Sequence, residues 1–199
     1  LCNAHPALAD ACAHVQGYEF DSGLHYTVPW STPLLELTCC SKDTPSFDLM
    51  GDANGIFDRI VIGENEPFNI KLGEKHLPEL YAQFPKDKKA LDAFMDMSDA
   101  GMMAVKLIVF SKLLPLWLQP YFWKLVPHKY IDVMSKTAKD LLPPHTTNNH
   151  LISLLSSMWI DTGARPDKAT FMLTSSVFRG LAMEGAAYPA GGSVSMAAA

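Results

Sequence analysis

Charge and cysteine are both scarce in this 199-residue sequence. Charged residues make up 19% of it, below the roughly 25% typical of soluble globular chains. Hydrophobic residues make up 48%, so the chain must bury much apolar surface or present it to lipid, and intrinsic disorder is not expected. The net charge of −5 offers no excess of lysine and arginine for gripping phosphates, which excludes nucleic acid as an expected partner.

The four cysteines form no recognisable metal-binding or disulfide pattern. They are Cys2, Cys12, Cys39 and Cys40, with no C-x-x-C spacing and no histidines at zinc-finger intervals. We therefore expect no metal site, and we interpret residues 1–16, with His5 and His14, as an alanine-rich helix. The absence of an N-x-[ST] sequon, together with so few cysteines, suits a reducing compartment.

The sequence also lacks an apolar run long enough for a membrane-spanning helix, which needs about 20 residues. Its most lipid-like part, Met102–Val126, contains three lysines and is broken by Pro115 and Pro120. Two interpretations stay open for this part. It is either an interfacial patch with aromatic side chains at headgroup level, or a buried helical hairpin whose aromatics pack a core or line a ligand cavity. The aromatic residues concerned are Trp117, Tyr121, Phe122 and Trp123.

The pattern of apolar residues changes near residue 75. Before it, short segments predict strands at Tyr18–Asp21, Ser46–Met50, Ile56–Ile62 and Pro67–Lys71. The Asn54-Gly55 pair predicts a hairpin turn between the second and third of these strands. After residue 75 the apolar spacing is helical, as in the stripe of Leu91, Phe94, Met95 and Met102. The sequence therefore predicts an α+β chain with a few strands followed by a helical block.

Two glycine-containing motifs and one polar cluster stand out. In Gly17–Tyr26 a strand ends at Asp21, and Gly23 removes a side chain just before His25. In Tyr188–Ser193 the paired Gly191 and Gly192 precede an apparent helix start, whose bare N–H groups suit a phosphate or an electron-rich oxygen. Each motif is also compatible with an ordinary turn. The polar cluster His145–His150 follows a double proline, and we interpret it as a helix-capping loop.

Four features occur together in an order that resembles the retinol saturase family. They are Glu19–Tyr26, the Asn54-Gly55 turn, Phe84-Pro85 after a short helix, and Tyr188–Ser193. That family is grouped with carotenoid isomerases and phytoene desaturases among the FAD flavoproteins. The resemblance covers residues 17–199 and implies a Rossmann-like FAD domain interrupted by a helical substrate domain. The implied boundaries are 1–26 for one edge of the FAD domain, 27–187 for the insertion and 188–199 for the return.

The resemblance also implies a site and a reaction. Gly23, His25, Gly191 and Gly192 would lie beside the flavin, and the helices would cover an isoprenoid polyene. The parent would be an oxidoreductase that reduces or isomerises a conjugated double bond of a retinoid or carotenoid, with FAD as cofactor and NAD(P)H left open as electron donor. It would be membrane-associated, in the endoplasmic reticulum or a plastid. No residue is assigned a catalytic role.

The sequence departs from that family in having no G-x-G-x-x-G fingerprint for the ADP part of FAD. We therefore expect a fragment of a longer protein that, as given, neither binds FAD tightly nor turns over. Two other interpretations remain. One is a non-enzymatic lipid-binding or membrane-surface helical module, and the other is a paralogue that keeps the fold without catalysis.

Overall fold

The computed structural model describes residues 12–15, 18–21, 26–29, 32, 46–71, 73 and 77–192, with the backbone alone at 12–15, 18–21 and 182–184. The chain divides into two compact units. We call the first the strand unit, and it comprises Leu1–Asp58, Ile70–Glu74 and Leu181–Ala199. The second is the helical unit, which comprises Arg59–Asn69 and Lys75–Gly180.

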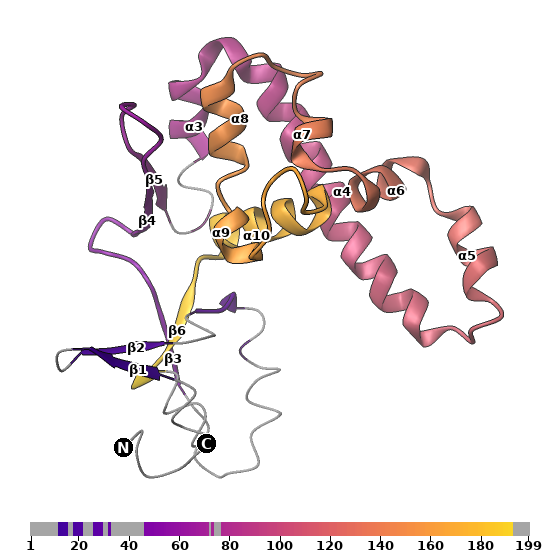
Figure 1. Ribbon diagram of the computed structural model, residues 1–199, viewed down its shortest axis with the longest axis horizontal. Helices are drawn as coiled ribbons and strands as arrows, with labels where there is room; N and C mark the ends of the chain where they lie inside the picture. Colours follow the sequence, from indigo (N-terminus) through magenta and orange to yellow (C-terminus); the bar gives the residue numbers. More distant parts are fainter. Residues whose placement is uncertain are drawn as a thin grey trace. The chain divides into compact units, whose positions relative to one another are not determined.

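The strand unit contains two antiparallel strand pairs (Figure 1). Strand β1 (Cys12–Val15) pairs with β2 (Tyr18–Asp21), and β3 (Phe47–Leu49) pairs with β6 (Ala187–Pro189). Ala187 is opposite both Leu49 and Thr27, so β6 lies between β3 and the segment around Thr27. The helix expected over residues 1–16 is therefore wrong at Cys12–Val15, because pairing with β2 holds these residues extended.

The turn at Asn54-Gly55 forms, but the hairpin predicted around it is wrong. The Asp52 carboxylate accepts hydrogen bonds from the N–H groups of Asn54 (2.8 Å) and Ile56 (3.0 Å), and Gly55 has a φ of 75°. The strands on either side of this turn have other partners. Strand β3 pairs with β6, and β4 (Ile56–Ile60) pairs with β5 (Phe68–Lys71).

The helical unit is organised along one long helix, α4 (Lys88–Leu113), which lies beside α6 (Figure 1). The other helical elements are α3 (Leu77–Gln83), the 3₁₀ helix η3 (Pro85–Asp87), α5 (Gln119–Leu125), α6 (His128–Ser135), α7 (Ala138–Leu141), α8 (Asn149–Leu155), α9 (Trp159–Thr162) and α10 (Phe171–Glu184). These elements confirm the α+β class and the helical character predicted after residue 75. None of the described helices combines enough length with enough apolar character to cross a membrane.

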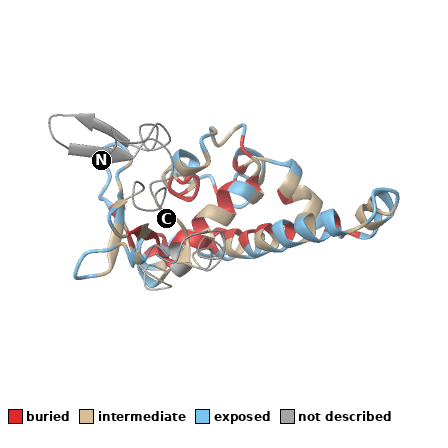
Figure 2. Cartoon of the chain, turned by 90° about the horizontal axis from the view of Figure 1, so that it is seen from below, coloured by how far each residue is buried: buried red, intermediate tan, exposed pale blue. Residues whose placement is uncertain are grey.

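The core of the helical unit forms where α4 packs against α10. The Phe94 ring meets the rings of Phe171 and Phe178 edge to face, with centroids 5.8 and 5.2 Å apart. All three side chains are fully buried, and the buried positions follow one side of α4 (Figure 2). About two helical turns beyond Phe94, a Cβ placed on Gly101 would lie 2.6 Å from Ser175 Oγ. The two helix backbones therefore approach closely at Gly101.

Replacing Gly101 with valine is expected to destabilise the helical unit by roughly 1–3 kcal/mol, because the added atoms overpack the contact between α4 and α10. Urea denaturation of wild type and variant measures the change. As a control, Gly101→Ala is better tolerated in a Ser175→Ala background, where the nearest obstructing atom is gone. A valine variant as stable as wild type would contradict the close approach.

Candidate functional site

The Gly191–Gly192 turn directly follows β6. Both glycines are left-handed, with φ of 81° and 79°, a conformation that side-chain-bearing residues adopt only with strain. Gly191 is exposed, and a Cβ on Gly192 would make only ordinary contact with Tyr188 Oη at 3.5 Å. The conformation, more than a shortage of space, therefore requires glycine here. The result is a short stretch of bare backbone that a flat ring can approach closely.

Two hydrogen bonds join β6 to the segment around Thr27. Thr27 N–H donates to the Ala187 carbonyl at 2.8 Å, and Ala187 N–H donates to the Thr27 carbonyl at 2.7 Å. Because this pairing is antiparallel, the beginning of the 26–28 segment and the end of β6 lie at the same end of the pair. On the other side, Ala190 N–H donates to the Ser46 carbonyl at 2.8 Å, which anchors the start of the glycine turn.

Of the four cofactor-adjacent residues predicted from the sequence, two lie on this turn. Gly191 and Gly192 are described, whereas Gly23 and His25 lie outside the described residues. Their proximity to a flavin therefore stays a prediction, as do the domain boundaries at 1–26, 27–187 and 188–199. Within the described part of the chain, no group of three or more His, Cys, Asp or Glu side chains is placed to hold a metal ion.

A groove of about 560 Å³ lies between α4 and α6 in the helical unit, within the range of about 300–1,000 Å³ typical of small-ligand pockets. Its lining combines apolar side chains with two carboxylates, a phenol and an ammonium. The residues are Asp96, Met97, Asp99, Ala100, Met103, Lys129, Tyr130 and Val133. Such a lining can hold an apolar chain and hydrogen-bond a polar group at its end.

Two acidic side chains of α4, Asp99 in the groove and Asp92 next to it along the helix, have hydrogen-bonding partners. Arg179 binds Asp99 through Nη2 at 2.8 Å and Nε at 3.1 Å. Tyr81 donates a 2.7 Å hydrogen bond to Asp92, one turn of α4 before Asp96. Burial raises the pKa of Tyr81 to about 12, helped by that hydrogen bond and by the charges of Asp92 and Asp96. Tyr81 therefore remains a neutral hydrogen-bond donor throughout the physiological pH range.

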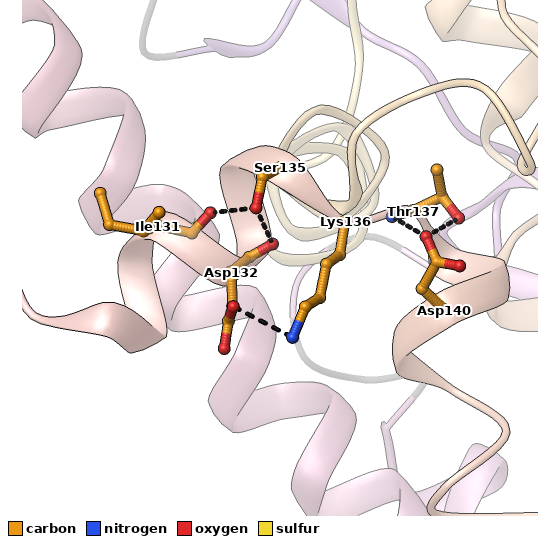
Figure 3. Close-up of polar contacts among 6 residues, drawn as sticks. All are labelled: Ile131, Asp132, Ser135, Lys136, Thr137 and Asp140. Atoms are coloured by element: carbon orange, nitrogen blue, oxygen red, sulfur yellow. Dashed lines mark hydrogen bonds and ion pairs between the residues drawn. The ribbon is translucent and has the colours of Figure 1, made fainter.

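The groove wall formed by α6 is held by the junction between α6 and α7 (Figure 3). The Asp140 carboxylate accepts hydrogen bonds from Thr137 N–H (2.9 Å) and Oγ1 (2.7 Å), a capping arrangement that holds the pKa of Asp140 below its usual value. Lys136 pairs with Asp132 at 3.0 Å, and its carbonyl accepts from Phe171 N–H at 2.8 Å. The last bond ties the end of α6 to the start of α10.

The polar cluster at 145–150 is a capping loop, as predicted. Asn148 is the N-cap of α8, and its side-chain oxygen accepts from the N–H groups of His150 (3.1 Å) and Leu151 (3.3 Å). Its amide nitrogen donates to Asp87 at 2.9 Å, and Thr146 donates to the same carboxylate at 2.6 Å. These two hydrogen bonds hold the pKa of Asp87 below its usual value of 3.8, and the bond from Thr146 has the larger effect.

Comparison with known proteins supports the resemblance stated from the sequence. The chain is 29% identical over 201 residues to an all-trans-retinol 13,14-reductase from Danio rerio, covering 95% of this chain and 33% of that protein. It is 23% identical over 185 residues to an inactive all-trans-retinol 13,14-reductase from the same organism, covering 89% and 30% respectively. The chain thus spans about a third of the length of these relatives. No family model matches the sequence.

Sequence reasoning missed the groove. Its α4 wall uses Asp96, Asp99, Ala100 and Met103, which are spaced three and four residues apart and so share one helix face. The stripe singled out from the sequence, which includes Leu91 and Phe94, marks the neighbouring buried face. The groove-lining face of α4 could be recognised in the sequence as a mixed apolar and acidic face. The sequence did not reveal its partner, because α6 lies about 30 residues later in the chain.

Asp87→Asn is expected to lower the melting temperature near neutral pH, because an amide supplies a single acceptor oxygen for Thr146 and Asn148. Since the folded-state pKa of Asp87 is depressed, its contribution is present above the unfolded-state pKa near 3.8 and is lost as pH falls through the folded-state pKa. The difference between variant and wild type therefore shrinks with acidification. Thermal melts between neutral and acidic pH measure it, with Asp48→Asn on exposed β3 as the matched control.

Asn148→Ala removes the cap of α8 and is expected to cost about 1 kcal/mol of stability. Asn148→Asp keeps the capping oxygen but places a second carboxylate beside Asp87, so it is expected to be destabilising near neutral pH and to recover in acid. Urea denaturation at two pH values separates these two variants. Equal stability of both variants and wild type would show that the cap and the bond to Asp87 contribute nothing.

Proposed function

We propose that this chain is the substrate-covering part of an oxidoreductase that reduces a carbon–carbon double bond of a retinoid. The observation that carries the proposal is the similarity to a retinol 13,14-reductase along 95% of the chain. It is supported by the α+β architecture with a helical unit, which is the arrangement expected of a substrate domain inserted in a flavin-binding domain. The boundaries of that insertion are part of the proposal.

We further propose FAD as the cofactor, with Gly191 and Gly192 against the flavin ring. Two consecutive left-handed glycines, one of them exposed, fit close contact between backbone and a flat aromatic system. The sequence has no dinucleotide fingerprint for the ADP part, so the residues present fit the ring end of the cofactor alone. A reduced flavin, when bound, supplies the hydride for double-bond reduction.

The role of this chain's own side chains is to bind and orient the polyene. We assign part of the polyene to the groove between α4 and α6, where Met97, Met103 and Val133 provide apolar contact. Tyr130 and Asp96 provide hydrogen-bonding atoms for a terminal hydroxyl. Reduction also requires a proton at the second carbon, and no described residue is assigned to deliver it.

The test uses the longer polypeptide that carries this sequence. Incubated with all-trans-retinol and either dithionite or NADPH, it is expected to yield a product with two additional hydrogen atoms and a shorter conjugated system, detected by mass and absorbance. The purified protein is expected to be yellow and to bleach on reduction. Retinol that binds but returns unchanged from a colourless protein would overturn the proposal in favour of a lipid carrier.

A groove-filling variant tests where the polyene binds. Met103→Trp places a large side chain in the groove and is expected to raise the KM for retinol several-fold with little change in kcat, since it removes binding shared by ground and transition states. Leu173→Trp on α10 is the matched control, because Leu173 is as exposed as Met103 and does not line the groove. Equal KM values in both variants would exclude the groove.

The similarity to a protein named as an inactive reductase favours a second candidate function. In it, the chain keeps the fold and binds a retinoid without converting it. The same experiment separates the two. A yellow protein that binds retinol and gives no reduced product with either electron donor would establish the inactive form.

A further inference from the structure

The end of α4, the following turn and α5 form a tip with an unusual amount of exposed apolar surface. We define the α4–α5 tip as residues 106–125. Leu116 and Leu125 are 84% exposed, Leu113 is 77% exposed and Trp117 is 71% exposed. Val109, Phe110 and Tyr121 add further exposed apolar area. Exposed apolar side chains concentrated on one turn mark an interaction surface. With Trp117 and Tyr121 exposed and Phe122 and Trp123 half-buried, the segment is not the buried hairpin that the sequence left open.

The tip has a defined shape. Leu118 N–H donates to the Pro115 carbonyl at 2.9 Å, and the Gln119 side chain donates to the Leu114 carbonyl at 3.1 Å, which closes the turn between the helices. The Phe110 ring on α4 contacts the Phe122 ring on α5, with centroids 5.6 Å apart. The exposed side chains therefore project from an ordered turn that lies away from the other helices of the unit (Figures 1 and 2).

The charge of this part of the chain has one sign. Residues 100–131 contain four lysines and no aspartate or glutamate, in a chain whose net charge is −5. After Lys88 and Lys89 at its start, the first half of α4 carries Asp92, Asp96 and Asp99, whereas its second half carries lysines and no acidic residue. The exposed lysines near the apolar side chains are Lys106, Lys112 and Lys124, and Lys124 Nζ lies 5.6 Å from the centre of the Tyr121 ring.

We propose that the α4–α5 tip docks on the surface of an anionic lipid bilayer. Apolar side chains flanked by lysines, with Trp and Tyr among them, match an interface in which hydrocarbon meets negatively charged headgroups. Leu116 and Trp117 at the turn enter the headgroup region, and Lys112 and Lys124 bind lipid phosphates. Pairing with a second copy is disfavoured, because it brings two sets of lysines together without acidic partners. The proposal does not depend on retinoid reduction.

Vesicle sedimentation of the 199-residue chain tests the docking directly. Binding is expected to be at least tenfold tighter to vesicles of phosphatidylcholine mixed with phosphatidylserine than to phosphatidylcholine alone, and to weaken as salt is added. Tryptophan emission is expected to shift to the blue on binding, as Trp117 leaves water. Equal binding to both vesicle types, or none to either, would overturn the proposal.

Two pairs of variants locate the binding surface. Leu116→Ser/Trp117→Ser is expected to lower the vesicle partition coefficient about tenfold or more, whereas Trp159→Ser/Ile160→Ser, at exposed apolar residues of α9, leaves it unchanged. Lys112→Glu/Lys124→Glu is expected to abolish the preference for phosphatidylserine, whereas Lys88→Glu/Lys89→Glu, at exposed residues of early α4, preserves it. Melting temperatures of all four variants verify that they remain folded.

Other occupants of the tip give different results. If a second copy covers it, the chain sediments as a dimer without vesicles, and Leu116→Ser/Trp117→Ser converts it to a monomer without changing vesicle binding. If another segment of the parent protein covers it, the longer polypeptide fails to bind vesicles that the 199-residue chain binds. Either result overturns the proposal.

Discussion

The close contact between α4 and α10 is the constraint on which the helical unit depends. Gly101 allows the two backbones to approach, and the Phe94 ring fits between Phe171 and Phe178 at the same interface. With one side of α4 fixed in this way, a second side is left to form the groove with α6. The end of α4 then extends past its partners and carries the tip. One helix thus contributes to the core, a ligand-sized groove and an exposed apolar surface.

The fold class and most local elements follow from the sequence, whereas strand partners do not. Short extended segments and the change to helical spacing predicted β2 to β5 and the helical character after residue 75 correctly, because these signals depend on neighbouring residues. The sequence did not predict β6, which overlaps the segment interpreted as a turn. Cys12–Val15 was misjudged because its alanine-rich surroundings favour helix, and pairing with β2 overrides that preference. The Asn54-Gly55 turn was correct, but β3 finds its partner nearly 140 residues later, which no local signal reveals.

The candidate site divides in the same way. Gly191 and Gly192 stood out in the sequence as paired glycines before an apparent helix start, and the structure adds that both have positive φ angles. Their place beside a flavin stays a prediction. The groove was missed because its two walls come from helices whose packing is a tertiary property. The segment around Trp117 left two interpretations open, since exposed and buried aromatic runs have the same composition. Only packing distinguishes them.

The pairing of Thr27 with Ala187 has a consequence for how relatives of this chain can vary. The two hydrogen bonds close a chain loop that contains the whole helical unit. The entropy of loop closure grows only logarithmically, by about 0.6 kcal/mol for each doubling of length. Lengthening or shortening the turn between α4 and α5 therefore changes the closure entropy little and leaves the strand pairing intact. Such a chain can acquire a new tip by insertion or deletion while the ends of its loop stay joined.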